Sequence, residues 1–313
     1  MGFTGVWPRG HGQFHPSASP ADTKARQPWP LGDSQTHWQG GKASTRGTEQ
    51  APGHSPALRL ISPSMSDTLL THLEAGVLSL TFNRPQKKNA FTGEMYDAAA
   101  RALVEADAND AVRVVVLTGA GGAFTAGNDL KDFLEHPPTG ESSPVFRFLA
   151  ALAHLSRPVV AGVDGVAVGI GTTLLLHCDY VAASERAVFS MPFVNLGLSP
   201  EGASSVLLPR VAGMALASEL LMFGEPFDAP TALRAGIINQ VVPEASLAEV
   251  VHKRAAALAA KPVESLRLTK RLLREPLRAT VDDALSREGT LFIQRLGSAE
   301  AREAFNAFLS KKK

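Results

Sequence analysis

The stretch VNLGLSPEGASS, residues 194–205, holds one acidic side chain, Glu201, behind a Ser-Pro pair in an otherwise apolar and small-residue setting. Ser199 as a helix N-cap, Pro200 as the first helical residue and Glu201 in the first turn predict the start of a helix. A carboxyl beside apolar residues such as Leu198 is also suited to proton transfer, because such neighbours raise its pKa and exclude water. The cap and the catalyst are compatible interpretations of Glu201.

Two glycine-containing stretches could supply backbone amides to a ligand. FTAGNDL, residues 124–130, allows close approach of a ligand to its backbone. VDGVAVGIG, residues 163–171, leads into an apolar helix, whose first N–H groups have no partner within the helix and favour an oxyanion. Each stretch alone is also compatible with a plain turn or with close packing. Together with Glu201 they form the minimum apparatus for removing a proton α to a thioester and stabilising the enolate.

The composition excludes several other classes of function. The chain has 313 residues, 44% of them hydrophobic, and a formal charge of +1, so we expect a globular enzyme-sized protein that binds no nucleic acid. We expect no membrane partner, because no apolar run is long enough to span a bilayer. The single cysteine, Cys178, excludes an intramolecular disulfide and lies in an apolar run. The sequence contains no G-x-S-x-G, Walker or H-E-x-x-H motif, and we expect no metal site.

The chain divides into an unusual beginning and a regular remainder. Residues 1–64 are rich in Gly, Pro, Ser, Gln and His without periodicity, so we expect a disordered or artefactual N-terminal extension. Strand-like and helix-like stretches then alternate, and the pattern is helical almost to the end after about Ser204. Thr92 is positioned to cap one of the helices. This order predicts an α/β fold with a ligand crevice at the carboxyl ends of the strands.

Several motifs in order resemble the crotonase superfamily, the enoyl-CoA hydratase/isomerase group, from Leu69 to the C-terminal helices. They are LTFNRPQKKNAF, RVVVLTGAGGAFTAGNDLKDF, the long stretch from RPVVAGVDG to LSPEGASS, and LMFGEPFDAPTALRAGIINQVVP. The resemblance implies a spiral of ββα units, with an acyl-CoA-binding core over residues 65–260 and a helical region over residues 261–313 that covers the coenzyme and forms trimers. It implies a homotrimer or a dimer of trimers. Coenzyme A would be part of the substrate, so no separate cofactor is expected.

The same resemblance assigns roles to individual residues. The thioester oxygen would be held by the backbone N–H groups of Asn128 and Ile170. The acyl pocket would include Phe193 and Leu198. The positions that would contact the substrate or its coenzyme A are Lys87, Lys88, Ala90, Ala126, Gly127, Asp129, Leu130, Gly169 and Gly171. The two lysines fit a phosphate chemically, although exposed lysines are often merely solvated.

The departures from the family pattern indicate the reaction. Hydratases of this superfamily have two glutamates, where this chain has Thr173 and Phe193. The single acid at Glu201 resembles the peroxisomal-type Δ3,Δ2-enoyl-CoA isomerases and their bacterial relatives. We therefore expect an isomerase of fatty-acid β-oxidation that converts 3-enoyl-CoA to trans-2-enoyl-CoA, with Glu201 moving the proton from C2 to C4. We expect a cytoplasmic location by default, because the sequence ends in SKKK and not in the Ser-Lys-Leu peroxisomal signal.

Two alternatives remain open at this point. The chain could be another crotonase-type acyl-CoA enzyme, namely a hydratase, a thioester hydrolase or a dehalogenase that uses Glu201. It could also be a non-catalytic acyl-CoA-binding paralogue. Other polar residues near the loops are expected to be structural: Asp129 and Asp132 as loop caps, Asp164 as a support and His177 as a core residue.

Overall fold

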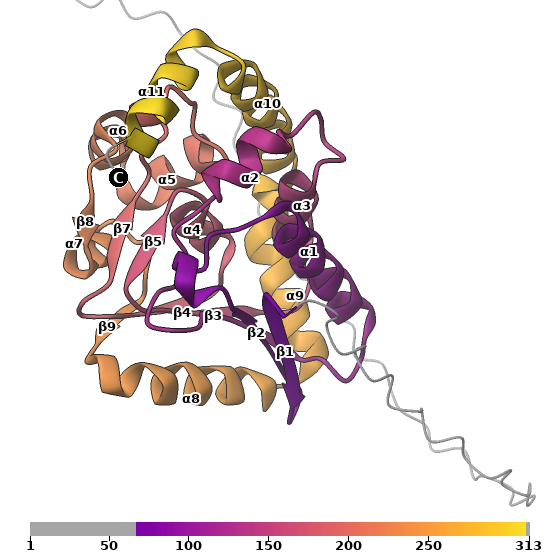
Figure 1. Ribbon diagram of the computed structural model, residues 1–313. Coiled ribbons are helices and arrows are strands. Elements are labelled where there is room, and N and C mark those ends of the chain that lie inside the picture. Colours follow the sequence, from indigo (N-terminus) through magenta and orange to yellow (C-terminus); the bar gives the residue numbers. More distant parts are fainter. Residues whose placement is uncertain (1–66, 311–313) are drawn as a thin grey trace, which may run out of the picture. The chain divides into compact units, whose positions relative to one another are not determined.

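This computed structural model describes residues 67–310. A six-stranded sheet lies at the centre of the fold (Figure 1). In spatial order its strands are β1 (Leu69–Glu74), β2 (Val77–Phe82), β3 (Val114–Gly119), β4 (Val159–Val163), β6 (Tyr180–Ser184) and β9 (Gln240–Val242). The first two strands form an antiparallel hairpin, and all later neighbours are parallel. The predicted N-terminal extension, residues 1–64, lies outside the described residues.

The central strands are buried on both faces because helices cover each side. Alternate residues of β3 point to opposite faces. Val114 and Val116 pack in a cluster with Val251 of α8 (Leu247–Ala259), which runs along the sheet in Figure 1. Val115 and Leu117 belong to the larger core, which includes α1 (Gly93–Ala108) and α3 (Pro144–His154). The continuous β-branched run of β3 fits this double burial.

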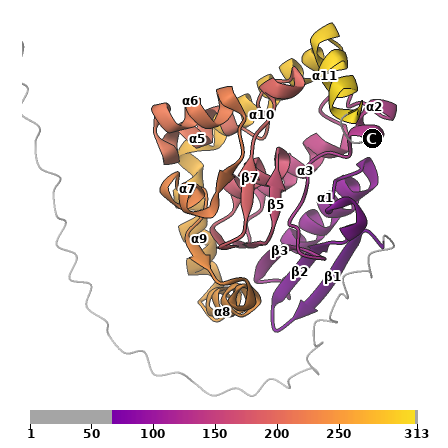
Figure 2. The same cartoon turned by 60° about the vertical axis from the view of Figure 1, so that its left-hand side comes forward.

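A second, three-stranded sheet lies in the order β5 (Val166–Val168), β7 (Val188–Ser190) and β8 (Phe227–Asp228). The remaining α-helices are α2 (Leu130–Glu135), α4 (Ile170–Thr173), α5 (Ser204–Ala212), α6 (Met214–Phe223), α7 (Ala229–Arg234), α9 (Val263–Arg274), α10 (Arg278–Leu296) and α11 (Ala299–Ser310). Short 3₁₀ helices are η1 (Pro85–Lys87), η2 (Leu174–His177), η3 (Val194–Leu196), η4 (Glu244–Ser246) and η5 (Glu275–Leu277). Helix α5 packs against α6 and α10 (Figure 2).

Several predicted elements agree with the structure. Thr92 caps α1, where its hydroxyl accepts the Met95 N–H at 3.3 Å. The chain after Ser204 is mainly helical, although the short strands β8 and β9 interrupt it. Among residues 67–310, no helix is both long and apolar enough to cross a membrane. The division of the chain at residue 260 into a core and a trimer-forming region stays a prediction.

The predicted start of the helix at Ser199 is wrong. Helix α5 begins at Ser204, and Glu201 precedes it in a turn. Gly202 (φ +70°) and Ala203 (φ +56°) are left-handed, so these two residues cannot belong to a right-handed helix. The Ser199 hydroxyl is buried without a hydrogen-bond partner in the described part of the chain, and it caps nothing.

Candidate active site

The Glu201 carboxyl is buried in the turn before α5, with 4% of the residue exposed. Its Oε1 accepts a hydrogen bond from the Thr173 hydroxyl at 2.5 Å, and Thr173 is the last residue of α4. Its Oε2 has no hydrogen-bond partner among the described residues. The backbone at Gly202 packs closely against the Thr173 side chain, because a Cβ at Gly202 would be 3.1 Å from the Thr173 Oγ1. Within the described residues, the Glu201 carboxyl therefore has one oxygen with a hydrogen-bond partner and one oxygen without.

Burial raises the pKa of Glu201 to about 8, because it removes water from around the charged form. The hydrogen bond from Thr173 opposes this rise, and the nearby carboxyl of Glu288 adds to it. A carboxyl with a pKa near neutrality can both accept and return a proton, which is the requirement for a general acid–base group.

The two predicted amide-bearing loops meet at their backbones. Residue Thr125 pairs with Ala167 in an isolated β-bridge. A Cβ at Gly127, whose φ is +81°, would lie 2.6 Å from the Val168 carbonyl oxygen. A Cβ at Gly171 would lie 2.6 Å from the Thr125 Cγ2. Only glycine permits this approach, so the close packing of the loops explains why small residues occur there.

The N–H groups of Asn128 and Ile170 make no hydrogen bond within residues 67–310. The amides on one side of each are engaged: the N–H of Asp129 binds the Phe91 carbonyl, and that of Gly169 binds the Ser190 carbonyl. The Asn128 and Ile170 amides are therefore available, one from each of the two contacting loops. Such a pair can stabilise a negative oxygen if both amides reach it.

Tyr96, a residue that the sequence did not single out, holds the Asn128 side chain. Its hydroxyl donates to the Asn128 Oδ1 at 2.5 Å, and its ring stacks on Phe91 with centroids 4.7 Å apart. Burial, and then the charge of Glu201, raise the pKa of Tyr96 well above its usual value, so it stays a hydroxyl donor. The available signal was an aromatic residue with a polar tip on the apolar face of the helix that follows Thr92.

The residues assigned to coenzyme A surround the first loop. Lys87 and Lys88 are exposed at the end of η1, and the Lys88 carbonyl accepts the Ala126 N–H at 2.8 Å. The Asp129 carboxylate caps α2 and pairs with Arg84 at 3.1 Å. Ala90 is buried, and its carbonyl accepts from Arg84 at 2.6 Å, whereas Leu130 is half-buried at the start of α2. Hydrogen bonds and an ion pair thus connect residues 84–90 to the loop of residues 124–130, and Lys87 and Lys88 are the exposed lysines of this region.

Phe193 and Leu198, the residues assigned to the acyl pocket, are 4% and 8% exposed and belong to the main core. The Phe193 ring faces the second loop, because a Cβ at Gly169 would be 3.9 Å from the ring. The Leu198 N–H binds the Phe193 carbonyl at 2.8 Å. Both residues thus flank the segment between the second loop and Glu201, and their contact with an acyl chain stays a prediction.

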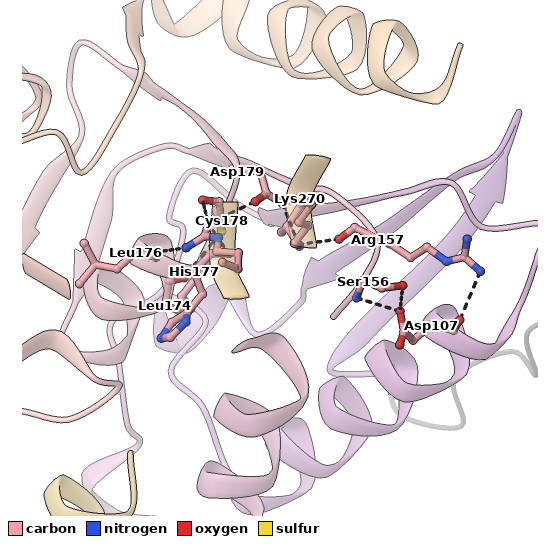
Figure 3. A network of polar contacts seen from close by, with 11 residues as sticks. Asp107, Ser156, Arg157, Leu174, Leu176, His177, Cys178, Asp179 and Lys270 are labelled. Carbon is pink, nitrogen blue, oxygen red and sulfur yellow. Dashed lines mark hydrogen bonds and ion pairs between the residues drawn. The ribbon is translucent and has the colours of Figure 1, made fainter. Parts of the chain in front are cut away.

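Helix α9 contacts the C-terminal end of η2, which is the end of the α4–η2 segment opposite to Ile170. Arg274 donates to the carbonyls of Leu176, His177 and Cys178 at 2.9–3.3 Å. Figure 3 shows Lys270 next to Asp179 and the carbonyl of Arg157, which it contacts at 2.8 and 2.7 Å. Arg274 thus binds the carbonyl end of the α4–η2 segment, which is favourable for a cation at a helix C-terminus.

The other predicted structural residues are engaged as expected. His177 is buried and donates through Nε2 to the Gly202 carbonyl at 2.8 Å, and burial lowers its pKa to about 4. Asp132 accepts the Gly93 N–H at 2.8 Å. The Arg186 guanidinium lowers the pKa of Asp164, and burial raises that of Cys178 to about 12. Within the described residues, no group of His, Cys, Asp and Glu could hold a metal ion.

Comparison with known proteins gives consistent matches over most of the chain. The sequence profile of the enoyl-CoA hydratase/isomerase family matches residues 72–313. The chain is 40% identical to the 1,2-epoxyphenylacetyl-CoA isomerase of Escherichia coli K12, over 79% of this chain and 97% of that protein. It is 37% identical to human enoyl-CoA delta isomerase 2, over 79% of this chain and 64% of that protein.

Structural similarity extends over the same part of the chain. The structure of Pseudomonas aeruginosa OdaA matches with a TM-score of 0.76 and 45% identity, over 78% of this chain and 99% of that one. Sequence relatives at 30–40% identity include isomerases, hydratases and dehalogenases that act on coenzyme A thioesters by name.

Proposed function

Because the chain belongs to the enoyl-CoA hydratase/isomerase family, we propose that it is an enoyl-CoA isomerase that converts 3-enoyl-CoA to trans-2-enoyl-CoA. The family resemblance and the crotonase-like α/β fold with C-terminal helices, both predicted from the sequence, are confirmed. The family alone leaves the reaction open, because its members include hydratases and dehalogenases. The observation that carries the proposal is the buried carboxyl of Glu201, which is hydrogen-bonded to the Thr173 hydroxyl, together with a phenyl ring at Phe193.

The proposed reaction needs two amides and one carboxylate. The thioester oxygen accepts the N–H groups of Asn128 and Ile170. The Oε2 of ionised Glu201 removes a proton from C2, and the electron pair of that C–H bond delocalises into a dienolate whose charge rests on the thioester oxygen. The same oxygen then returns the proton to C4, and the double bond moves to C2–C3. The reaction is a proton transfer, so it needs no cofactor apart from the coenzyme A of the substrate.

The surroundings of Glu201 suit a reaction that consumes no water. Thr173 holds Oε1, which leaves Oε2 to carry the proton. Phe193 and Leu198 are buried apolar residues in the segment that leads to Glu201. Adding water across a double bond requires one group to activate water and another to protonate carbon, and Glu201 alone does not provide that pair.

A direct assay tests the function and the base together. The purified protein is mixed with a trans-3-enoyl-CoA, and the absorbance of the conjugated 2-enoyl thioester is followed. We expect conjugation by the wild type and a loss of about 10²–10⁴-fold in kcat for Glu201→Gln. Glu105→Gln, an exposed substitution near the C-terminal end of α1, is the matched control and should keep the full rate.

Other results of this assay would favour the alternatives. Full activity of Glu201→Gln would remove Glu201 from the mechanism. Release of free coenzyme A, formation of a 3-hydroxyacyl-CoA, or binding without turnover would support a hydrolase, a hydratase or an acyl-CoA-binding paralogue, respectively. A halogenated aroyl-CoA tests for a dehalogenase.

A second candidate is the isomerisation of an aryl epoxide thioester. It is favoured by the 40% identity to the 1,2-epoxyphenylacetyl-CoA isomerase, because the match covers 97% of that protein. Running both substrates at equal concentration separates the candidates by their kcat/KM values. A higher value for the epoxide would make this the function of the chain.

The cellular setting and the assembly form part of the same proposal. We place the enzyme in the cytoplasm, in the β-oxidation of unsaturated chains, as a homotrimer or a dimer of trimers. Exposed apolar side chains on α6 support an assembly: Met214 is 70%, Met222 68% and Phe223 64% exposed. Light scattering of the purified protein measures the number of copies, and a monomer would exclude this part of the proposal.

A further inference from the structure

A second buried carboxyl lies at the start of α5. Glu288, on α10, is 5% exposed. Its Oε1 accepts the Ser205 N–H at 3.0 Å and also the Ser205 hydroxyl. Its Oε2 is buried without a hydrogen-bond partner in residues 67–310, as is the Oε2 of Glu201. One helix start thus has two buried carboxyls, from segments that are far apart in the sequence.

The two carboxyls are stabilised unequally. The N-terminus of a helix favours a negative charge through its unpaired N–H groups and its dipole. Glu288 occupies this position and receives two hydrogen bonds from Ser205. Glu201 lies three residues before α5 begins at Ser204, and among the described residues its carboxyl accepts only the Thr173 hydroxyl. The stabilisation that α5 offers to an anion therefore goes to Glu288, and Glu201 keeps its affinity for a proton.

We propose that Glu288 is a positioning residue for the reaction: it fixes the first turn of α5 behind Glu201 and, as an anion, opposes the ionisation of Glu201. This inference rests on the proposed function, because it treats the proton carried by Glu201 as the one transferred. Glu288 acts through Glu201 and the Ser205 turn, without touching the substrate. The raised pKa of Glu201, to which Glu288 contributes, agrees with this role.

The other groups around the pair do not replace Glu288. Tyr96, from α1, is a neutral phenol whose pKa is raised. His177, from η2, is neutral above about pH 4 and donates to Gly202. Arg287, the cationic neighbour on α10, pairs with Asp283 on the surface. Burial raises the pKa of Glu288 as well, and its hydrogen bonds from Ser205 oppose that rise. In its ionised form Glu288 is the charged neighbour that moves the Glu201 equilibrium toward the protonated form.

The test uses Glu288→Gln, because the amide oxygen can still accept from Ser205 while the charge is lost. The titration of Glu201 is followed by carbon NMR of labelled glutamate carboxyls, with Glu201→Gln to assign the signal. We expect the midpoint for Glu201 to fall by about half a pH unit or more. The midpoint of the pH profile of kcat/KM should fall with it, and KM at high pH should change less than about twofold.

Two more variants complete the experiment. Ser205→Ala removes one hydrogen bond to Glu288 and should lower the midpoint by a smaller amount, which gives a second test if Glu288→Gln does not fold. Glu105→Gln, at an exposed position near the C-terminal end of α1, should leave the midpoint unchanged.

Unchanged titration of Glu201 in both Glu288→Gln and Ser205→Ala would overturn the inference. A lowered midpoint in a protein that shows no isomerase activity would keep the role of Glu288 and reject the proposed function, since the titration does not depend on turnover.

Discussion

At the scale of single residues, the two oxygens of Glu201 have different surroundings. Oε1 is held by the Thr173 hydroxyl, whereas Oε2 is buried without a hydrogen-bond partner in the described residues. The hydrogen bond favours the anion and lowers the pKa of Glu201, in opposition to burial. Thr173 therefore adjusts the proton affinity of the carboxyl and directs the other oxygen to the reaction.

Removal of this hydroxyl should shift the pH dependence of the enzyme upward. Thr173→Val keeps the shape of the side chain but removes the donor, so the pKa of Glu201 should rise above its value of about 8. The base acts when ionised, so kcat/KM rises with pH, and the variant should lose about three- to tenfold at pH ~7 with partial recovery at higher pH. A pH–rate profile measures this, with Thr173→Ser as the control that keeps a hydroxyl. A midpoint that stays or falls would contradict the role of Thr173.

Sequence alone could predict the residues whose signal is local. Glu201 and the two glycine-containing loops were singled out because an isolated acid and glycine-rich stretches are visible in short segments, whereas the roles of the Asn128 and Ile170 amides came from the family resemblance. The contacts of Tyr96 and Glu288 could not be predicted in this way. Tyr96 reaches Asn128 across 32 residues, and Glu288 reaches Ser205 across 83 residues. Tertiary packing selects such partners, and no periodicity in the sequence records it.

At the scale of elements, the site depends on the contact of two loops. The loop of Asn128 and the loop of Ile170 are joined by the Thr125–Ala167 bridge. Each loop has a glycine at the point of contact, where a Cβ would meet the other loop. The distance between the two amides is thus set by backbone packing, so a small side chain at the contact should separate them.

Gly127→Ala should impair catalysis by this route. Its methyl group would lie 2.6 Å from the Val168 carbonyl oxygen at a φ of +81°, so the loop must move. We expect kcat to fall about tenfold or more, since removing one donor from such a site costs about 10²–10³-fold, and the melting temperature to fall by several degrees. Gly140→Ala is the matched control, because no atom of the described residues lies within 4 Å of its added Cβ. Equal activity of the two variants would show that the contact does not position the amides.

Element boundaries were predictable where the local chemistry was decisive. The Thr92 cap was confirmed because a side-chain oxygen next to a periodic apolar helix has one dominant outcome. The Ser199 start was wrong because the left-handed turn at Gly202 and Ala203 delays the helix. Strand β8 has two residues and β9 has three, too few to show a period of two.

At the scale of the whole molecule, the C-terminal helices support the site from outside the sheets. Arg274 of α9 binds three carbonyls at the end of η2, and Glu288 of α10 binds the start of α5. The segments that carry Ile170 and Glu201 are therefore both held by residues far along the chain. Removing these helices should disturb the site itself as well as any assembly of subunits.

The burial of Glu201 makes the stability of the whole molecule depend on pH. Its pKa is about 8 in the folded chain and near 4.5 when unfolded, so the folded state binds the proton more tightly. The stability that this proton contributes is complete below about pH 4.5 and is lost as the pH rises to about 8, by up to roughly 5 kcal/mol. The Gln side chain of Glu201→Gln does not titrate. The free energy of unfolding of this variant, relative to that of the wild type, should therefore increase as the pH rises from about 4.5 to about 8, while its activity is lost. Urea unfolding at about pH 5, 7 and 8.5 measures the difference, with Glu105→Gln as the surface control. A difference that stays constant with pH would mean that Glu201 is ionised in the folded protein as readily as in the unfolded chain, and the buried carboxyl could not then serve as a proton carrier near neutrality.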